Sequence, residues 1–295
     1  MNKKRTILVS VLPELEENVL RHYILNSTSF ANQIGADMHF LAGCDVQAAL
    51  NSILKESPVT YQNLQAIFHP IVGNWSSDIV NDTVRQYSCD LILVPLGNIN
   101  DNGAARSKLR NELFEKAESP ILILSPKIDL AKTPIGSVLI PMSGEIYVSA
   151  ALKFGLRFAS LIHVPVDLVH VLPGESGTES FKKSSLDTLG DQPHHEYRQL
   201  LERILAEASP FSEPKERAQV RSLYQVQGVP AVEILKAAKN EPTCALIGEW
   251  HGSLIHGKAE ILKDLLNEIL IPIFLVKTES EEKSILRIGP ESEAA

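Results

Sequence analysis

Residues 248–260 form the stretch of this sequence that is best suited to hold a charged ligand. They read Gly-Glu-Trp-His-Gly-Ser-Leu-Ile-His-Gly-Lys-Ala-Glu, which combines glycines with a lysine. Glycines let a backbone approach phosphate groups closely, and the N-terminus of a following helix supplies N–H donors and a favourable dipole. Gly252, Gly257 and Lys258 have the spacing of a P-loop, but Ala259 replaces the hydroxyl residue that would hold Mg²⁺. We therefore interpret the P-loop match as coincidental and the stretch as a degenerate candidate for phosphate binding.

Other side chains that could do chemistry give weaker signals. Trp250 could stack on an adenine ring, although a tryptophan in a loop more often packs against the protein itself. His251 and His256 lie in the same stretch, and His194 and His195 lie far from it. Metal sites need three or four convergent ligands, and no spacing here indicates one. The chain also lacks Gly-x-Ser-x-Gly and Cys-x-x-Cys, so the sequence predicts neither catalytic residues nor a metal site.

The segments that must position these residues alternate between apolar strands and amphipathic helices. This alternation predicts a parallel, doubly wound α/β sheet. The predicted strands are 7–11, 37–41, 64–71, 91–94, 120–124, 138–141, 166–172, 220–226, 245–248 and 273–276. The predicted helices are 15–34, 47–55, 76–87, 108–117, 146–161, 196–206, 230–239 and 260–269.

The same order of landmarks occurs twice along the chain, which indicates two copies of one fold. Thr-Ile-Leu-Val-Ser-Val at 6–11 recurs as Ser-Val-Leu-Ile-Pro-Met at 137–142, and Ser-Pro-Ile-Leu-Ile-Leu at 119–124 recurs as Ile-Pro-Ile-Phe-Leu-Val at 271–276. A third pair begins at Gly73 and Gly228 and continues to Cys89 and Cys244. We therefore predict two domains, a linker, an insertion and an acidic, disordered tail. The domains span 1–126 and 135–278, the linker spans 127–134, the insertion spans 173–221 and the tail spans 279–295. Residues 174–193, within the insertion, are predicted as a loop because Gly, Ser and Asp are frequent there.

Composition excludes several classes of protein. A length of 295 residues fits two domains of roughly 150 residues each. The net charge of −8 argues against a broad nucleic-acid surface, which needs an excess of basic residues. Cysteine occurs only at Cys44, Cys89 and Cys244, which fits a reducing compartment, and we interpret the last two as small buried hydrophobes. No apolar run approaches the ~18 residues of a membrane helix, and none resembles a signal peptide. We expect a cytoplasmic protein with no nucleic-acid or membrane partner.

Several segments resemble those of one known family. Residues 138–145 are similar to its opening strand, 166–171 to its second strand, and 226–235 to its Val-x-Gly-x-Pro-x-x-x-Ile segment. Cys89-Asp-Leu-Ile-Leu93 is similar to its Ala-Asp-Leu-Ile-Val. In this repeated order, the segments resemble a tandem universal stress protein over residues 6–125 and 137–277. The resemblance implies two Rossmann-like, adenine-nucleotide-hydrolase-like domains that pair through their last strands as an intramolecular pseudo-dimer.

Nucleotide-binding members of that family carry Gly-x-x-Gly, nine residues and then Gly-Ser or Gly-Thr, together with an acidic residue after the first strand. In the first copy, Gly97 is followed by Asn100 instead of the second glycine, and Leu12 occupies the acidic position. The first copy is therefore predicted to be structural.

The second copy departs from the pattern in a different way. Gly248 and Gly252 are one residue too far apart, Ala259-Glu260 occupy the final Gly-Ser position, and Ser143 occupies the acidic position. A glutamate at the start of a helix suits the helix dipole but repels phosphate. Any ligand chemistry that remains is predicted to lie in this copy.

Three functions remain open. The leading hypothesis is a stress-response binding or regulatory protein that acts through a protein partner or self-association, without standard ATP binding. The alternative is an adenine-nucleotide sensor that binds ATP or AMP in the second copy, at the carboxyl ends of the strands. Its candidate residues are Ser143, Gly144, Gly228, Trp250, Gly252 and Lys258. The third is a slow nucleotide hydrolase, for which the sequence offers no evident base or metal ligands.

Overall fold

The computed structural model describes residues 4–13, 15–56, 65–96, 104–142, 150–173, 182–185, 220–241, 243–250, 261, 264–266, 268 and 270–277. The first half contributes strands β1 (Arg5–Ser10), β2 (Ala36–Gly43), β3 (Ala66–Ile71), β4 (Leu91–Pro95) and β5 (Ile121–Leu124). Its helices are α1 (Glu17–Ile34), α2 (Gln47–Glu56), α3 (Ser77–Tyr87) and α4 (Ala104–Lys116), with a 3₁₀ turn η1 (Cys44–Val46) before α2.

The second half repeats this alternation. Its strands are β6 (Ser137–Met142), β7 (Val166–Pro173), β8 (Lys182–Ser185), β9 (Val220–Gly228), β10 (Cys244–Trp250) and β11 (Ile273–Lys277). Its helices are α5 (Ala150–Leu161) and α7 (Pro230–Asn240), and residues 261, 264–266 and 268 are also helical.

Most predicted elements agree with the observed ones, and two differ. The helix predicted at 108–117 begins at Ala104. The loop predicted at 174–193 is wrong in part, because β8 forms there and pairs with β9. The predicted helix 196–206 and the predicted tail lie outside the described residues.

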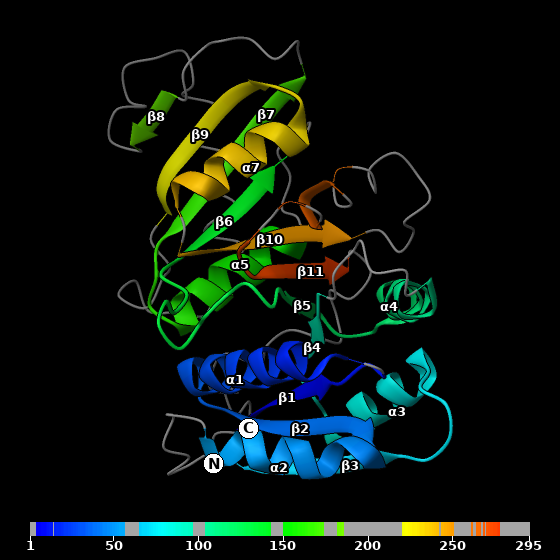
Figure 1. Cartoon of the computed structure of the whole chain (residues 1–295). Coiled ribbons are helices and arrows are strands. Elements are labelled where there is room, and N and C mark those ends of the chain that lie inside the picture. Colours follow the sequence, from blue (N-terminus) through cyan, green and yellow to red (C-terminus); the bar gives the residue numbers. More distant parts are fainter. Residues whose placement is uncertain are drawn as a thin grey trace, which may run out of the picture.

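The described strands form one sheet in the order β3-β2-β1-β4-β5-β11-β10-β6-β7-β9-β8, with helices on both faces (Figure 1). Neighbouring strands within each half run parallel, apart from the β8–β9 pair. The halves meet where β5 pairs antiparallel with β11, with Leu122 opposite Phe274. This confirms the predicted α/β fold and the pairing of the two last strands within one chain.

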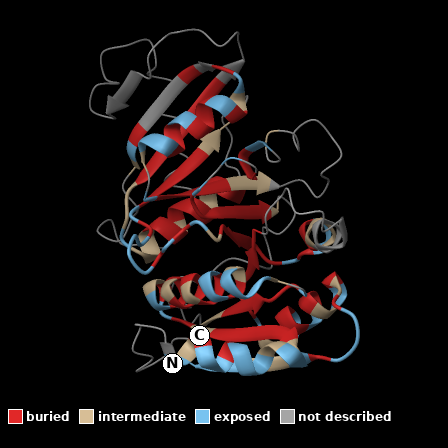
Figure 2. Ribbon diagram, in the orientation of Figure 1, coloured by how far each residue is buried: buried red, intermediate tan, exposed pale blue. Residues whose placement is uncertain are grey.

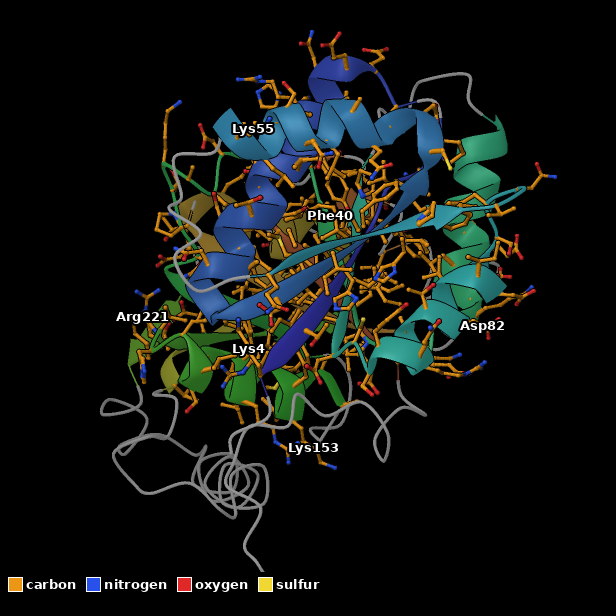
Figure 3. All side chains as sticks on the ribbon, turned by 90° about the horizontal axis from the view of Figure 1, so that it is seen from below. Lys4, Phe40, Lys55, Asp82, Lys153 and Arg221 are labelled. Carbon is orange, nitrogen blue, oxygen red and sulfur yellow. The ribbon has the colours of Figure 1, made fainter. Side chains whose placement is uncertain are left out.

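The helices pack on the sheet according to the alternation of its side chains. Buried residues on one face contact α1, α2 and α5, and those on the other contact α3, α4 and α7. The central strands are accordingly buried along most of their length (Figure 2). Phe40 of β2 lies inside the core, whereas Lys55 and Asp82 lie at the periphery (Figure 3). Helix α1 presents an apolar stripe to the sheet and ends at Gly35, whose φ of 64° is left-handed and favours glycine.

An aromatic cluster fills the core beneath the junction of the two halves. Phe274 of β11 contacts Phe30 of α1 and both Phe154 and Phe158 of α5. The ring centroids lie 5.9, 5.4 and 4.6 Å from that of Phe274, respectively. Aromatic pairs at such distances stabilise a core beyond the effect of area burial alone. The cluster therefore joins a helix of the first half to a strand and a helix of the second.

Two amide side chains of α1 bind residues between Ile128 and Ile135, most of which belong to the segment predicted as a linker. Asn26 donates from Nδ2 to the carbonyl of Ile128 (2.6 Å) and accepts from the amide of Leu130 (2.8 Å). Gln33 donates from Nε2 to the carbonyl of Ile135 (2.8 Å). Since Asn26 is buried, these bonds satisfy polar groups that would otherwise be costly in the core. The segment is thus fixed along α1, while the predicted domain boundaries stay a prediction.

We expect Phe274→Ala to lower the free energy of unfolding by about 3–5 kcal/mol, because it removes the ring shared by both halves and leaves a cavity. The matched control is Leu270→Ala, since Leu270 precedes the same strand but is 58% exposed. The control should change the stability by less than about 0.5 kcal/mol. Denaturant unfolding followed by circular dichroism measures both. Equal losses in the two variants would contradict the role given to the aromatic cluster.

Candidate functional site

Each half has one point where ligands of doubly wound sheets usually bind. That point lies outside the carboxyl ends of the two strands at which the strand order reverses. In the first half these strands are β1 and β4, and in the second half they are β6 and β10, which pair directly. In the second half this point, called the crevice below, lies beside Met142 at the end of β6 and Trp250 at the end of β10.

Most of the predicted ligand residues follow directly on these strand ends. Ser143, Gly144, Gly252 and Lys258 lie outside the described residues. Trp250 ends β10, where its backbone pairs with Lys277 of β11. Their part in ligand binding stays a prediction, and Gly228 is the candidate whose surroundings the structure describes.

Gly228 lies in close contact with a buried carboxylate. Its φ of 157° is one that residues with a side chain rarely adopt, and a Cβ added there would lie 3.0 Å from Cγ and from Oε1 of Glu233. Glu233 is 4% exposed and forms an ion pair with Lys236 at 2.6 Å. Gly228 also ends β9, which β7 separates from β6. Gly228 thus leaves room for the Glu233 side chain. This contact lies two strands away from β6 and the crevice.

The described charged groups at the carboxyl ends of the second half include two carboxylates, and two lysines that already have partners. Glu233 lies in the first turn of α7, where the helix dipole favours a negative charge. Glu249 lies near the end of β10, and its Oε1 is buried with no hydrogen-bond partner among the described residues. Lys236 is paired with Glu233, and Lys277 donates to the carbonyl of Glu115. Because both carboxylates repel anions and both lysines are already bonded, the described part of this end is poorly suited to bind an anion.

The corresponding end of the first half is apolar. Leu12, the residue at the family's acidic position, is 3% exposed and belongs to the same buried cluster as Trp75, Leu96 and Leu113. These side chains come from the ends of β1 and β4, the turn before α3, and α4. A carboxylate that could bind a ribose is therefore replaced by packed hydrocarbon.

A buried ionic network lies at the opposite, amino ends of the second half. Asp167, 1% exposed, accepts hydrogen bonds from Arg221 Nε (3.1 Å) and from the hydroxyl of Ser222. Arg221, at the rim of the molecule in Figure 3, also pairs with Glu241 at 3.1 Å, and its bonds to Asp167 raise the pKa of the guanidinium. The network joins β7 to β9 and to the end of α7. Its place, away from the crevice, indicates a structural role.

The buried cysteines behave as the sequence predicts. Cys89 and Cys244 are both buried, and burial raises the pKa of the Cys244 thiol to about 12. Its thiol is therefore protonated at neutral pH and unsuited to nucleophilic chemistry. Within the described residues no group of three or more His, Cys, Asp or Glu side chains could hold a metal ion.

One titratable pair escaped the sequence analysis. His39 of β2 and His69 of β3 share a hydrogen bond of 2.8 Å between Nδ1 and Nε2, and the ring of Tyr87 from α3 lies against both. The available signal was a histidine in each of two consecutive strands. Local patterns do not give the register that brings such residues together.

The comparisons with known proteins agree with this geometry. No family model matches the sequence, and no curated protein matches it. A functionally unknown protein from Pseudomonas aeruginosa PAO1 superposes with a TM-score of 0.58 and 16% identity, over 94% of this chain and 93% of that chain. A universal stress protein from Archaeoglobus fulgidus DSM 4304 gives 0.55 and 11%, over 92% and 98% of the two chains. The chain has the fold of a tandem universal stress protein.

That fold also occurs in a third similar structure, the cytoplasmic domain of a prokaryotic cation chloride cotransporter. The TM-score is 0.52 and the identity 11%, over 96% of this chain and 99% of that domain. In the part of the present chain that the structure describes, no helix is both long and apolar enough to cross a membrane. The universal stress protein fold fixes where a crevice lies, and the residues of this chain decide what it can bind.

We expect Gly228→Ala to lower the free energy of unfolding by about 1–3 kcal/mol, because its φ is strained for alanine and the new methyl group meets Glu233. Adding Glu233→Ala should recover part of this loss, because it removes the contact but not the backbone strain. Gly248→Ala is the control, since its nearest neighbour to an added Cβ is the carbonyl oxygen of Phe274 at 3.9 Å. Thermal unfolding of the variants measures these effects, and an unchanged Gly228→Ala protein would refute the packing role.

Proposed function

We propose that this protein is a binding or regulatory protein with the universal stress protein fold that does not bind ATP in the standard way. The observation that carries the proposal is the chemistry at the two crevices. The described carboxyl end is apolar around Leu12 in the first half, and in the second half it carries the carboxylates of Glu233, paired with Lys236, and of Glu249. Neither supplies the combination of a ribose-binding carboxylate and phosphate-binding groups that a nucleotide needs.

Electrostatics supports the proposal for the second half. A nucleotide phosphate placed near buried carboxylates meets a repulsion that water screens only weakly, because a low effective dielectric strengthens interactions between charges. Lys236 offsets the charge of Glu233, to which it is bound at 2.6 Å, and so does not offer a free cation. The sequence adds a further acid, Glu260, at the end of the glycine-rich stretch.

Packing supports the proposal for the first half. Leu12 and Leu96 follow the two strands at the reversal of strand order, and both are buried in the same apolar cluster as Trp75. A ribose hydroxyl placed there would lose its hydrogen bonds to water without gaining a carboxylate partner, which is unfavourable. We infer that function resides on surfaces of the protein, through a protein partner or self-association in the cytoplasm.

Purified protein should carry no ATP or AMP and should release no heat when titrated with ATP, ADP or AMP at up to millimolar concentration. The measurements are chromatography of nucleotides extracted from the purified protein, and isothermal titration calorimetry of the same preparation. Thermal unfolding of that preparation verifies that the protein is folded. Recovery of bound nucleotide in near-stoichiometric amount would overturn the proposal.

One observation favours the nucleotide sensor as a second candidate. The glycine-rich stretch begins within β10, and β10 pairs with β6 at the reversal of strand order, which is where ligands of doubly wound sheets usually bind. If calorimetry detects ATP or AMP, Gly252→Ala and Lys258→Ala should each weaken binding. Lys239→Ala, on the exposed side of α7, is the matched control and should bind as the wild type does. Equal affinities in all these proteins would remove the glycine-rich loop as the site.

Catalysis has the weakest support of the three hypotheses. A slow nucleotide hydrolase needs a base near the phosphates or a metal cage, and the described residues provide no metal-binding group. The histidine pair lies between β2 and β3, away from the β1–β4 reversal point. We therefore propose that the protein is not an enzyme.

A further inference from the structure

His39 and His69 form an in-plane hydrogen bond between two neutral imidazoles. Nδ1 of His39 lies 2.8 Å from Nε2 of His69, the ring planes differ by 16°, and the centroids are 4.9 Å apart. The centroid separation exceeds the nitrogen separation by roughly the radii of the two rings, so the rings lie edge to edge. One nitrogen must carry the shared proton and the other must offer its lone pair.

The pair joins the outermost strand of the first half to the strand beside it. Among the described strands β3 forms that edge of the sheet, and it pairs in parallel with β2. The ring of Tyr87 covers the pair, with centroids 4.2 Å from His69 and 4.8 Å from His39. Tyr87 belongs to the last turn of α3, so three elements meet at the shared proton.

Few charged groups surround the pair in the described structure. Asp37, two residues before His39 on β2, favours the protonated form of His39, but it is bound to Lys4 at 2.6 Å and accepts from the amide of Gln65. From α3 comes Tyr87, whose hydroxyl accepts from Gln86. Burial lowers the pKa of both histidines. A positive charge on His69 lowers the pKa of His39 further. Both rings are therefore neutral at pH 7, and one of them donates the shared proton to the other.

The second half bridges the equivalent strands with an ion pair and a hydroxyl group instead of two imidazoles. Leu8 pairs with His39 in the first half, and Leu139, which matches Leu8 in the repeat, pairs with Asp167 in the second. His39 and Asp167 thus occupy equivalent positions on the same face. Asp167 bonds to Arg221 and Ser222 of the neighbouring strand β9. Histidine is the side chain whose ordinary pKa lies between pH 5 and 8, and the bridge of the second half contains none.

We propose that His39, His69 and Tyr87 form an acid-sensitive latch that holds the edge strand β3 to the sheet. A first added proton keeps the hydrogen bond, because an imidazolium still donates to a neutral imidazole. A second proton leaves two donors facing each other under the Tyr87 ring, so the bond must break and the rings must separate. Acid then loosens β3 and the end of α3, while the Asp167–Arg221 bridge holds the second half closed.

The sign of the pH effect follows from the lowered pKa values. A histidine whose pKa is lower in the folded state than its unfolded value of about 6.5 stabilises the fold fully above that pH. The contribution is lost as pH falls from about 6.5 through the lowered folded-state pKa. In acid, the equilibrium constant for local opening should rise about tenfold for each unit by which the folded state lowers the pKa of a histidine.

Titration of the wild-type protein by histidine NMR tests the shared proton. We expect the two rings to titrate in separate steps, with midpoints more than about one pH unit apart. In His69→Gln, the single step of His39 should move towards higher pH, because the neighbouring charge is gone. Two wild-type histidines that titrate independently within one unit of each other would overturn the proposal, whether or not the variant folds.

Amide hydrogen exchange tests the effect on β3. Between about pH 7.5 and pH 5.0, and after correction for intrinsic rates, protection of Ala66–Ile71 should fall by about tenfold or more, while that of β9 should change much less. In the double variant His39→Gln with His69→Gln, this difference between the two strands should disappear. His22→Gln, which removes an exposed histidine of α1, is the control and should behave as the wild type does. Equal losses of protection in β3 and β9, or an unchanged difference in the double variant, would refute the latch.

Discussion

The antiparallel contact between β5 and β11 determines the arrangement of everything else in this chain. Three residue pairs form it, from Ile121 opposite Leu275 to Ile123 opposite Ile273. An unpaired strand edge leaves a row of amide and carbonyl groups that attract other chains. By pairing these two edges, the protein joins two parallel sheets into one and removes both edges at once. The Phe274 cluster and the α1 contacts with residues 128–135 then cover the junction from one side.

The direction of that contact also separates the two halves functionally. The strands of each half run parallel to their own last strand, but β5 and β11 run in opposite directions. The carboxyl ends of the two halves therefore lie at opposite edges of the common sheet. The β1–β4 and β6–β10 reversal points therefore face opposite ends of the strands. One of them is apolar around Leu12, while the other keeps a glycine-rich stretch.

Local patterns predict the buried frame well because burial imposes a period on the sequence. The apolar run at Ile7–Val11 predicts β1, and the stripe that ends at Gly35 predicts α1. The same reasoning fails where burial is not the cause. Strand β8 reads Lys-Lys-Ser-Ser and has no apolar signal, and the first residues of α4 carry no apolar stripe.

The candidate site is less predictable because its contacts join residues that are distant in sequence. The closeness of Glu233 to Gly228 depends on how α7 begins, and the His39–His69 bond depends on the register of β2 against β3. Neither contact can be predicted from a local periodicity of the sequence. Ser143, Gly144, Gly252 and Lys258 follow strands that the sequence locates correctly, and they lie outside the described residues. Sequence thus gives the position of the crevice more reliably than its chemistry.

The equivalent positions of His39 and Asp167 show how one copy of a repeated fold can hold two strands together permanently while the other does so in a way that depends on pH. Both side chains link the second strand of their half to the strand beyond it, on the face covered by α3 or α7. Asp167 is a buried carboxylate bonded to Arg221 and Ser222, and removing either partner would leave an uncompensated buried group. The imidazole pair instead keeps its hydrogen bond only while at least one of the two rings is neutral, a condition that acid removes. Because the halves share one sheet but not one crevice, the edge at β3 can open while the β5–β11 junction and the second half stay closed. A common bridging position thus carries an imidazole in one copy and a carboxylate in the other, which gives the two copies different means of responding to protons.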